Sequence, residues 1–243
     1  MPATLLQAAA ATSAATGLLL GGCAYAALWP QSQLFGHVLV AGPNPNHIAL
    51  TYDDGPNPAA TPQLLEVLSY HNVRATFFMI GTFVRQQPAL VRQVAAAGHL
   101  IGNHTMTHPW LAWQSNTRIR RELADCNHAL EDTLGTPIRF FRAPHGARRP
   151  FVLRTAAQLG LTPVQWNVTA FDWNPIPPEK ILSHLQRGIA HNQRRHRASN
   201  LLLHDGGHLG LNQPRLASVH ATDLLLHQHA NTATQFVTPE AWI

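Results

Sequence analysis

The feature that most constrains the fold of this chain is an alternation of short apolar runs with helical segments. Apolar, β-rich runs occupy residues 47–52, 73–80 and 99–102. The segments between them are amphipathic; one begins at Thr61-Pro62 and another ends at Gly98, residue types that favour the start and the end of a helix. A strand–helix repeat of this kind predicts an α/β fold, with a parallel sheet and helices packed on it.

The same alternation continues to the end of the chain. The longest helical segment runs from Asn116 to Leu134, carries apolar residues at helical spacing, and is stopped by Gly135. Further strands are expected at residues 138–141, 161–167, 200–204 and 235–238, and further helices at 151–159, 178–190 and 215–228. In a βα-repeated barrel the carboxyl ends of the strands share one rim, so polar residues that follow strands are the candidates for a functional site.

Two adjacent carboxylates, Asp53 and Asp54, end the first strand. Gly55-Pro56 follows, and the strand must stop there because proline cannot extend a β-ladder and glycine tolerates a sharp turn. Neighbouring strand side chains point to opposite faces, so one Asp can hold a metal ion while the other moves a proton. Taken alone, an Asp-Gly pair is more typical of a solvated turn. Whether this pair belongs to a functional site depends on the residues at the later strand ends.

A pair of histidines, His104 and His108, follows the third strand. They are four residues apart, so both imidazoles lie on one face of a helical turn and can bind one ion. In a chain with sixteen histidines such a pair also arises by chance. A position at a strand end, shared with Asp54, favours a site of one carboxylate and two imidazoles, which leaves room for water and substrate as in catalytic metal sites.

Two more strand ends carry polar side chains. Arg142 follows a strand, where its guanidinium can neutralise and orient an unprotonated Asp53; the alternative is a surface guanidinium beside a turn. His204 ends a buried strand, with Asp172 expected nearby on the same rim, and an imidazole there is suited to general acid catalysis. The alternative for His204 is a neutral histidine of the core.

Composition bounds the class of protein. With 243 residues, 45% hydrophobic and 12% charged, the chain can form one sizeable domain with a full core and is not disordered. The formal net charge is +5, but the basic residues are scattered and form no long stripe with interleaved aromatics, which argues against a nucleic-acid partner. The positive charge fits either anionic cell-envelope polymers or ordinary solubility.

Histidine and cysteine usage add little to the list of candidates. Five of the sixteen histidines are expected at the surface, without a carboxylate partner at ligand spacing. These are His191, His196, His220, His227 and His229. The two cysteines, Cys23 and Cys126, lie far apart in dissimilar settings, which excludes a disulfide framework and a cysteine-ligated zinc site.

The first part of the chain, residues 1–29, is an apolar segment. Residues 4–29 contain no charged side chain and are long enough to cross a bilayer as a helix. No Lys or Arg precedes them, as a secretory signal requires, and for the same reason the stretch ending at Cys23 matches a lipoprotein processing site poorly. We expect a signal-anchor or transmembrane helix here; a helix packed on the domain or a poorly ordered leader are the alternatives. Residues 30–45, rich in proline, are expected to form an irregular linker before a domain at 46–238.

The strand-end motifs resemble, in order, the five motifs of the polysaccharide deacetylase (NodB homology) family of carbohydrate esterases. The matching stretches are Thr51 to Pro56, His104 to His108, Arg142 to Gly146, Asp172-Trp173 and Leu202 to Asp205. The resemblance covers residues 46–238 and implies a distorted (β/α) barrel and a metal-dependent deacetylase activity.

The resemblance also implies a role for each matching residue. The metal ligands implied are Asp54, His104 and His108, for a divalent ion; zinc comes first, with cobalt or another divalent ion as alternatives. The catalytic residues implied are Asp53 as the base, Arg142 as the cation that orients it, His204 as the acid, and Asp172 as a further acidic residue. The substrate contacts implied are Trp173 beside the groove, Leu202 in the acetyl pocket, and His145, whose backbone amide helps hold the oxyanion.

Three positions depart from the pattern of the family. Tyr52 stands where phenylalanine is usual, and His145 replaces the common tyrosine of the third motif, which leaves its amide in place but alters the groove wall. Thr169 stands where the fourth motif often has its first aspartate. Asp172 is then the one acidic residue of that motif, and the network that it completes is an open question.

We therefore expect a hydrolase that removes N-acetyl groups from glycans containing N-acetylglucosamine, such as peptidoglycan or chitin-like oligosaccharides. The alternatives are an esterase of O-acetyl groups such as those of acetylxylan, a hydrolase of small amides, and a non-catalytic sugar-binding relative. The expected setting is the cell envelope, on the periplasmic or extracellular side, with membrane anchoring through residues 1–29. The expected partner is the acetylated glycan, with no nucleic acid, and the protein is expected to be a monomer.

Overall fold

A computed structural model describes residues 21–243 of the chain. Most of the predicted amino-terminal helix therefore lies outside the described residues, and of that prediction only a helical stretch at residues 21–28 can be described. Across residues 21–243, none of the helices combines the length and the apolar character needed to span a bilayer.

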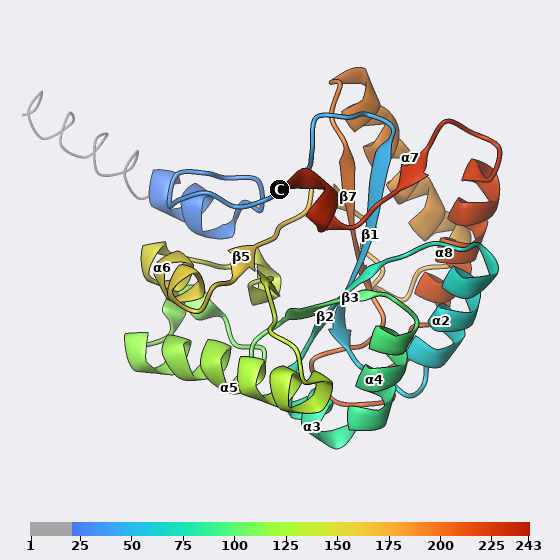
Figure 1. The fold of residues 1–243 in the computed structure, drawn as a ribbon. Helices are drawn as coiled ribbons and strands as arrows, with labels where there is room; N and C mark the ends of the chain where they lie inside the picture. Colours follow the sequence, from blue (N-terminus) through green and yellow to red (C-terminus); the bar gives the residue numbers. More distant parts are fainter. Residues whose placement is uncertain (1–20) are drawn as a thin grey trace, which may run out of the picture.

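The centre of the fold is a sheet of parallel strands, as the strand–helix repeat predicts (Figure 1). Its strands follow the order β5-β4-β3-β2-β1-β7-β6, and β8 pairs with the first residues of β1. Their bounds are β1 (His47–Gly55), β2 (Thr76–Met79), β3 (Leu100–Asn103), β4 (Phe140–Phe141), β5 (Thr162–Pro163), β6 (Val168–Thr169), β7 (Ser199–His204) and β8 (Gln235–Phe236). Every pairing is parallel, so the strand carboxyl ends lie on one side of the sheet.

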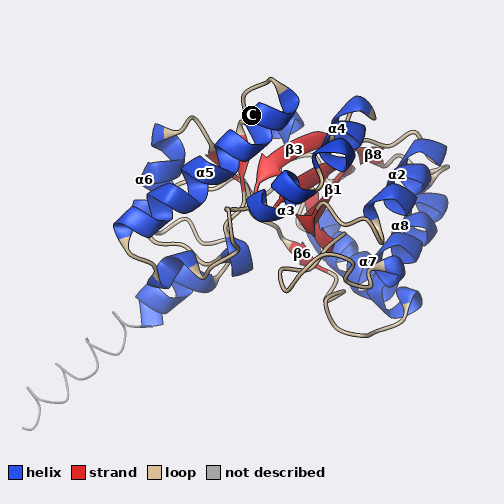
Figure 2. Ribbon diagram, turned by 90° about the horizontal axis from the view of Figure 1, so that it is seen from below, coloured by secondary structure: helices blue, strands red, loops and turns tan. Residues whose placement is uncertain are grey.

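Helices surround this sheet, as the view from below shows (Figure 2). They are α2 (Thr61–Tyr70), α3 (Gly81–Gln86), α4 (Pro88–Ala96), α5 (Asn116–Leu134), α6 (Pro150–Gln158), α7 (Pro178–Arg194) and α8 (Leu216–His229). The bounds of α5 match the prediction, because Ser115 caps its first turn by accepting from the N–H of Arg118, and Gly135 takes the left-handed conformation at its end.

The sheet forms a half barrel, because β5 and β6 at its two ends do not pair with each other within the described residues. Alternate strand residues face opposite sides: Phe77 packs with the helices, and Phe78 packs inside the half barrel against Phe140 and Val164. Leu39 joins this inner cluster and forms a parallel bridge with Val164. The residues before β1 therefore contribute to the core.

Residues 29–40 pack onto the domain although they lack regular secondary structure. Arg148 is 1% exposed, and its guanidinium donates hydrogen bonds to the carbonyl oxygens of Trp29, Pro30 and Ser32. Val38 and Val40 are buried against Leu153. The stretch predicted as a linker is thus irregular in backbone and packed in its side chains.

One predicted strand differs in the structure, and one helix of the structure was not predicted. Of the strand expected at 161–167, the structure forms only β5 (Thr162–Pro163), because Pro163 has no N–H for a longer ladder, and β6 follows beyond that range at Val168–Thr169. Helix α3 was not predicted; it begins at Gly81, where a Cβ would lie 3.1 Å from the Cα of Cys126, so the close packing of α3 on α5 requires glycine.

Candidate metal centre and active site

A cavity of about 1180 Å³ opens at the carboxyl ends of the strands. All but one of the residues predicted for the site line it: Asp53, Asp54, His104, His108, His145, Asp172, Trp173, Leu202 and His204. The exception, Arg142, is fully buried behind Asp53. The parallel sheet has brought together strand-end residues as far apart in the chain as Asp53 and His204, which are paired in register on β1 and β7.

Three of these residues form a buried trio around one carboxylate oxygen. Asp54 Oδ1 lies 3.1 Å from His108 Nε2 and 3.4 Å from His104 Nε2, and the three donor atoms lie within 4.8 Å of one another. One carboxylate and two imidazoles form the ligand set of many catalytic zinc sites. The three predicted metal ligands are therefore in position to share an ion, although residues 104–108 form an irregular loop and not the expected helical turn.

The hydrogen bonds of the trio fit a cation between its members. His104 Nδ1 lies 2.9 Å from the carbonyl oxygen of Arg142, which can only accept, so Nδ1 carries the proton of the neutral ring. Nε2 of His104 then presents a lone pair to Asp54 Oδ1, which has no hydrogen-bond partner in the described residues. Two lone pairs that face each other in a buried site repel, and a positive ion between them removes this repulsion.

The backbone around the trio is held in a strained conformation. Asp54 has φ 71° and His108 has φ 58°, in the left-handed region that non-glycine residues seldom adopt. Gly206 packs directly on the carbonyl group of Asp54, where a Cβ would overlap it. A strained backbone at these positions is typical of functional sites, where the surrounding packing fixes side-chain direction.

Asp53 is held by a cation on the side away from the trio. Arg142 Nη1 donates to Asp53 Oδ1 at 2.8 Å and to Thr51 Oγ1 at 2.8 Å. The guanidinium carbon lies 4.2 Å above the ring of Phe78. The predicted orientation of Asp53 by Arg142 matches these contacts, which leave Asp53 Oδ2 facing the trio, 3.7 Å from His104 Nε2.

His204, which is half-buried, and the buried Asp172 form a second pair across the cavity. Asp172 accepts from His204 Nδ1 at 2.9 Å, from the backbone N–H of His204 at 2.7 Å, and from Ser218 Oγ at 2.7 Å. Burial disfavours the charged ring, but the Asp172 carboxylate outweighs it and raises the pKa of His204 to about 9. His204 is therefore a charged imidazolium near neutral pH, and the network that Asp172 completes is the one that holds His204.

Aromatic and imidazole rings form the wall beside the trio. His145 stacks on Trp110 with ring centroids 4.0 Å apart and touches His108 edge-on at 4.6 Å. His208 stacks on the His108 ring, also at 4.6 Å, and lies edge-on to His145 at 5.8 Å. Burial, followed by the neighbouring imidazoles, lowers the pKa of His145 to about 3, so its ring is neutral.

The sequence did not single out several of these neighbours. Ser218 lies 46 residues beyond Asp172, and Trp110 occurs in a stretch with no pattern of its own. His208 had a usable signal, because it follows His204 at the same four-residue spacing as the His104 and His108 pair. Of the departures from the family pattern, Tyr52 is explained, since its buried hydroxyl lies 2.8 Å from Thr222 Oγ1.

Comparison with known proteins agrees with this fold and shows the family of the chain. The sequence model of the polysaccharide deacetylase family matches residues 41–164. A chitooligosaccharide deacetylase of Bradyrhizobium sp. (strain ANU 289) is 40% identical over 160 residues, which cover 65% of this chain and 70% of that protein. A peptidoglycan-N-acetylglucosamine deacetylase of Bacillus cereus is 34% identical over 197 residues, 80% of this chain and 87% of that protein.

Solved structures give the same result. A peptidoglycan N-acetylglucosamine deacetylase in complex with 4-naphthalen-1-yl-N-oxidanyl-benzamide superposes with a TM-score of 0.75 at 30% identity, over 85% of this chain and 92% of that one. A pseudoenzyme of the CE4 family from Bacillus anthracis superposes with a TM-score of 0.72 at 25% identity, over 85% of this chain and 66% of that one. The chain belongs to the polysaccharide deacetylase family.

Proposed function

We propose that this protein is a metal-dependent hydrolase that removes N-acetyl groups from glycans containing N-acetylglucosamine. The observation that carries the proposal is the placement of two proton-handling pairs around the trio Asp54, His104 and His108. Asp53, fixed by Arg142, lies on one side, and His204, fixed by Asp172, lies across the cavity. Hydrolysis of an amide needs one group to accept a proton from water and another to give a proton to the amine.

Asp54, His104 and His108 are the residues that would hold the ion, and zinc is the first candidate, with cobalt or another divalent ion next. When bound, a divalent ion supplies Lewis-acid polarisation of the acetyl carbonyl and lowers the pKa of water. Elemental analysis of protein purified without chelator tests its identity, and protein that is active without any divalent metal contradicts the assignment.

Asp53 acts as the base in this proposal. Arg142 occupies its Oδ1, which leaves Oδ2 to take a proton from the attacking water. The backbone N–H of His145, in the turn after β4, is the proposed donor to the oxyanion that develops at the acetyl carbonyl.

His204 acts as the acid. Its raised pKa keeps it protonated near neutral pH, so it can give a proton to the sugar nitrogen as the carbon–nitrogen bond breaks. Acetate and a free amine are the products. Leu202, 3% exposed in the cavity wall, is proposed to line the acetyl pocket.

The aromatic rings around the cavity support a glycan as substrate. Exposed rings of Trp110, Trp173 and Phe171 surround or adjoin it, and such rings offer flat apolar faces to a sugar. The substrates proposed first are chitin-like oligosaccharides and peptidoglycan, in line with the names of the related deacetylases. A pseudoenzyme with this fold exists, but here every candidate ligand and proton-handling residue is present.

Acetate release across a panel of substrates tests the proposal. The panel contains N-acetylglucosamine oligomers, peptidoglycan, acetylxylan and a small N-acetyl amide, each with and without added zinc. Asp53→Asn is expected to lose about 10²- to 10⁴-fold in rate while retaining metal, and Asp132→Asn, at an exposed position of α5, serves as the matched control. Preference for acetylxylan or the small amide would select the alternative hydrolases, and no turnover would select a sugar-binding role.

The setting proposed is the cell envelope, on the periplasmic or extracellular side, with residues 1–29 as a membrane anchor. Support comes from the uncharged stretch 4–29 in the sequence. Full release of the protein from membranes by carbonate would contradict the anchor. We also propose a monomer, and light scattering after gel filtration checks this.

A further inference from the structure

A second trio of ligand side chains lies outside the candidate active site. It consists of His71, just after α2, and Asp223 and His227, one turn apart on α8, and we call it the helix-end trio. Asp223 Oδ1 lies 2.7 Å from His71 Nε2 and 3.5 Å from His227 Nε2. The prediction that His227 has no carboxylate partner at ligand spacing is therefore wrong, because Asp223 precedes it by one helical turn.

The distances of the helix-end trio suit a metal ion. All three donor atoms lie within 4.8 Å of one another, as do those of the trio of the cavity. Tetrahedral zinc with ligands at about 2.0–2.1 Å places its donor atoms about 3.4 Å apart. The contact of His227 with Asp223 already matches this spacing, and the contact of His71 has to open by about 0.7 Å. The Asp223 side chain is 39% exposed and has room for that movement.

The electrostatic surroundings favour a cation. His71 is the residue at the carboxyl end of α2, and His227 lies in the last turn of α8. Helix carboxyl ends carry partial negative charge, so two of them lie beside the Asp223 carboxylate. Neither helix contains Lys or Arg to neutralise that carboxylate, and α2 adds Glu66.

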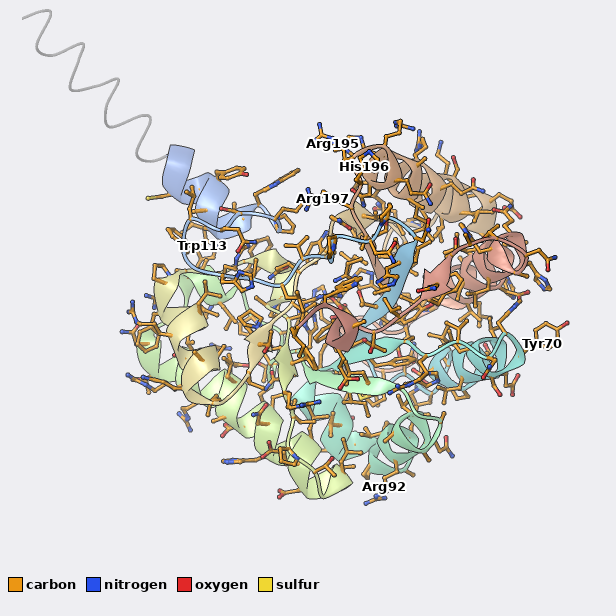
Figure 3. All side chains as sticks on the ribbon, turned by 45° about the horizontal axis from the view of Figure 1, so that its top comes forward. Tyr70, Arg92, Trp113, Arg195, His196 and Arg197 are labelled. Carbon is orange, nitrogen blue, oxygen red and sulfur yellow. The ribbon has the colours of Figure 1, made fainter. Side chains whose placement is uncertain are left out.

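Neighbouring rings hold the trio while leaving it open to solvent. His71 and His227 meet edge-on with centroids 4.6 Å apart, and Tyr70 packs edge-on against His71 at 5.0 Å. Figure 3 shows Tyr70 at the outer edge of the molecule, between α2 and α8. The His227 side chain is 55% exposed, which gives an ion a path of entry.

We propose that His71, Asp223 and His227 bind a second divalent cation, zinc or a similar transition metal, that cross-links α2 to α8. The site lies where α2 leads into β2, so it is at the opposite end of the sheet from the strand carboxyl ends that form the cavity. An ion there stabilises the folded domain without contact with the substrate. The site is structural, and the inference does not depend on the proposed function.

Metal stoichiometry of chelator-stripped protein tests the proposal. Wild-type protein titrated with Zn²⁺ is expected to bind two equivalents by calorimetry and elemental analysis, and His227→Ala one. Asp54→Ala, which disables the trio of the cavity, is expected to retain one equivalent, and the double variant Asp54→Ala/His227→Ala none. His191→Ala, at an exposed position of α7, is the matched control and keeps both.

Stability and spectra give readouts that do not depend on activity. Saturating Zn²⁺ is expected to raise the Tm of Asp54→Ala by about 5 °C and to leave that of the double variant unchanged. The difference between the Co²⁺ absorption spectra of wild-type protein and of His227→Ala is expected to show the ion bound at the helix-end trio. Deacetylation by His227→Ala is expected to stay at the wild-type rate. One equivalent in wild-type protein, or an unchanged stoichiometry in His227→Ala, overturns the proposal.

Discussion

Asp172 binds His204 twice, accepting from its backbone N–H with Oδ2 and from its imidazole Nδ1 with Oδ1. Ser218 donates to the same carboxylate from α8 and fixes its orientation. The Asp172 side chain is buried and that of His204 is 12% exposed, so solvent screens their charges only weakly. One carboxylate thus sets both the position and the protonation state of the candidate acid.

Substitution Asp172→Asn is expected to shift the pH profile of deacetylation. An imidazolium is the active form, so wild-type kcat/KM should fall as the pH rises through about 9, the pKa of His204. Without the carboxylate, the remaining effect of burial lowers the pKa of His204. The alkaline limb of the profile should then move to lower pH by more than one unit, and kcat/KM at neutral pH should fall by about 10²-fold. A Ser218→Ala variant should show a smaller shift in the same direction. An alkaline limb that stays in place in Asp172→Asn contradicts the assignment of His204.

The same pair makes stability depend on pH. The pKa of His204 is higher in the folded state, about 9, than its ordinary value of 6.5, so the folded state binds the proton more tightly. The stabilisation is fully present below pH 6.5 and is lost as the pH rises through about 9. Urea unfolding at several pH values should show this loss in wild-type protein and a flatter dependence in Asp172→Asn. Equal slopes in the two proteins would count against the buried ion pair.

Substitution Arg142→Met is expected to destabilise the fold as well as to reduce activity. It leaves the Asp53 carboxylate buried without its cation. Removal of one partner of an enclosed pair costs about 3–5 kcal/mol, and we expect about 2 kcal/mol here because Asp53 borders the cavity and can be hydrated. Arg139→Met is the matched control: Arg139 pairs with Glu240 at the surface, and its loss should cost under about 1 kcal/mol. Urea unfolding measures both.

Substitution Gly206→Ala is expected to weaken metal binding although residue 206 donates no ligand. A Cβ at this position would overlap the backbone carbonyl of Asp54 and displace that carboxylate from the trio. Zinc affinity should fall by about 10- to 100-fold, the loss typical when a group that positions a ligand is removed. Gly22→Ala, where an added Cβ meets nothing within 4 Å, should leave the affinity unchanged. Calorimetry with Zn²⁺ on folded protein, checked by circular dichroism, distinguishes the two.

Residues 29–45 are expected to stabilise the catalytic domain. Substitution Arg148→Ala removes the hydrogen bonds to the carbonyls of Trp29, Pro30 and Ser32, and should cost about 2–3 kcal/mol. A chain shortened to begin at residue 46 should lose at least as much. In that shortened chain the Arg148→Ala change should cost little further, because its partners are already gone. Additive losses would show that Arg148 acts elsewhere, and full stability of the shortened chain would place the domain boundary at residue 46.

The sequence by itself determined the repeating architecture and the positions of the chemical groups. Local signals act over a few residues: apolar runs set the strands, caps and glycines set the ends of α5, and each strand end places Asp54, His104 or His204 on the rim. These signals also defined the family motifs. They did not determine partners that are far apart in the chain, since hydrogen bonds such as that of Ser218 with Asp172 depend on how helices pack on the sheet.

Only the tertiary structure shows the physical reason why Asp53 and Asp54 divide their roles as the family motifs imply. The Asp53 carboxylate pairs with Arg142, and the Asp54 carboxylate faces His104 and His108. The two side chains point in different directions because the backbone at Asp54 is left-handed. Packing also placed the irregular residues before β1 in the core and brought His71 to Asp223 across 152 positions. Such contacts depend on how segments distant in the chain pack against one another, and they produce no periodic pattern in the sequence.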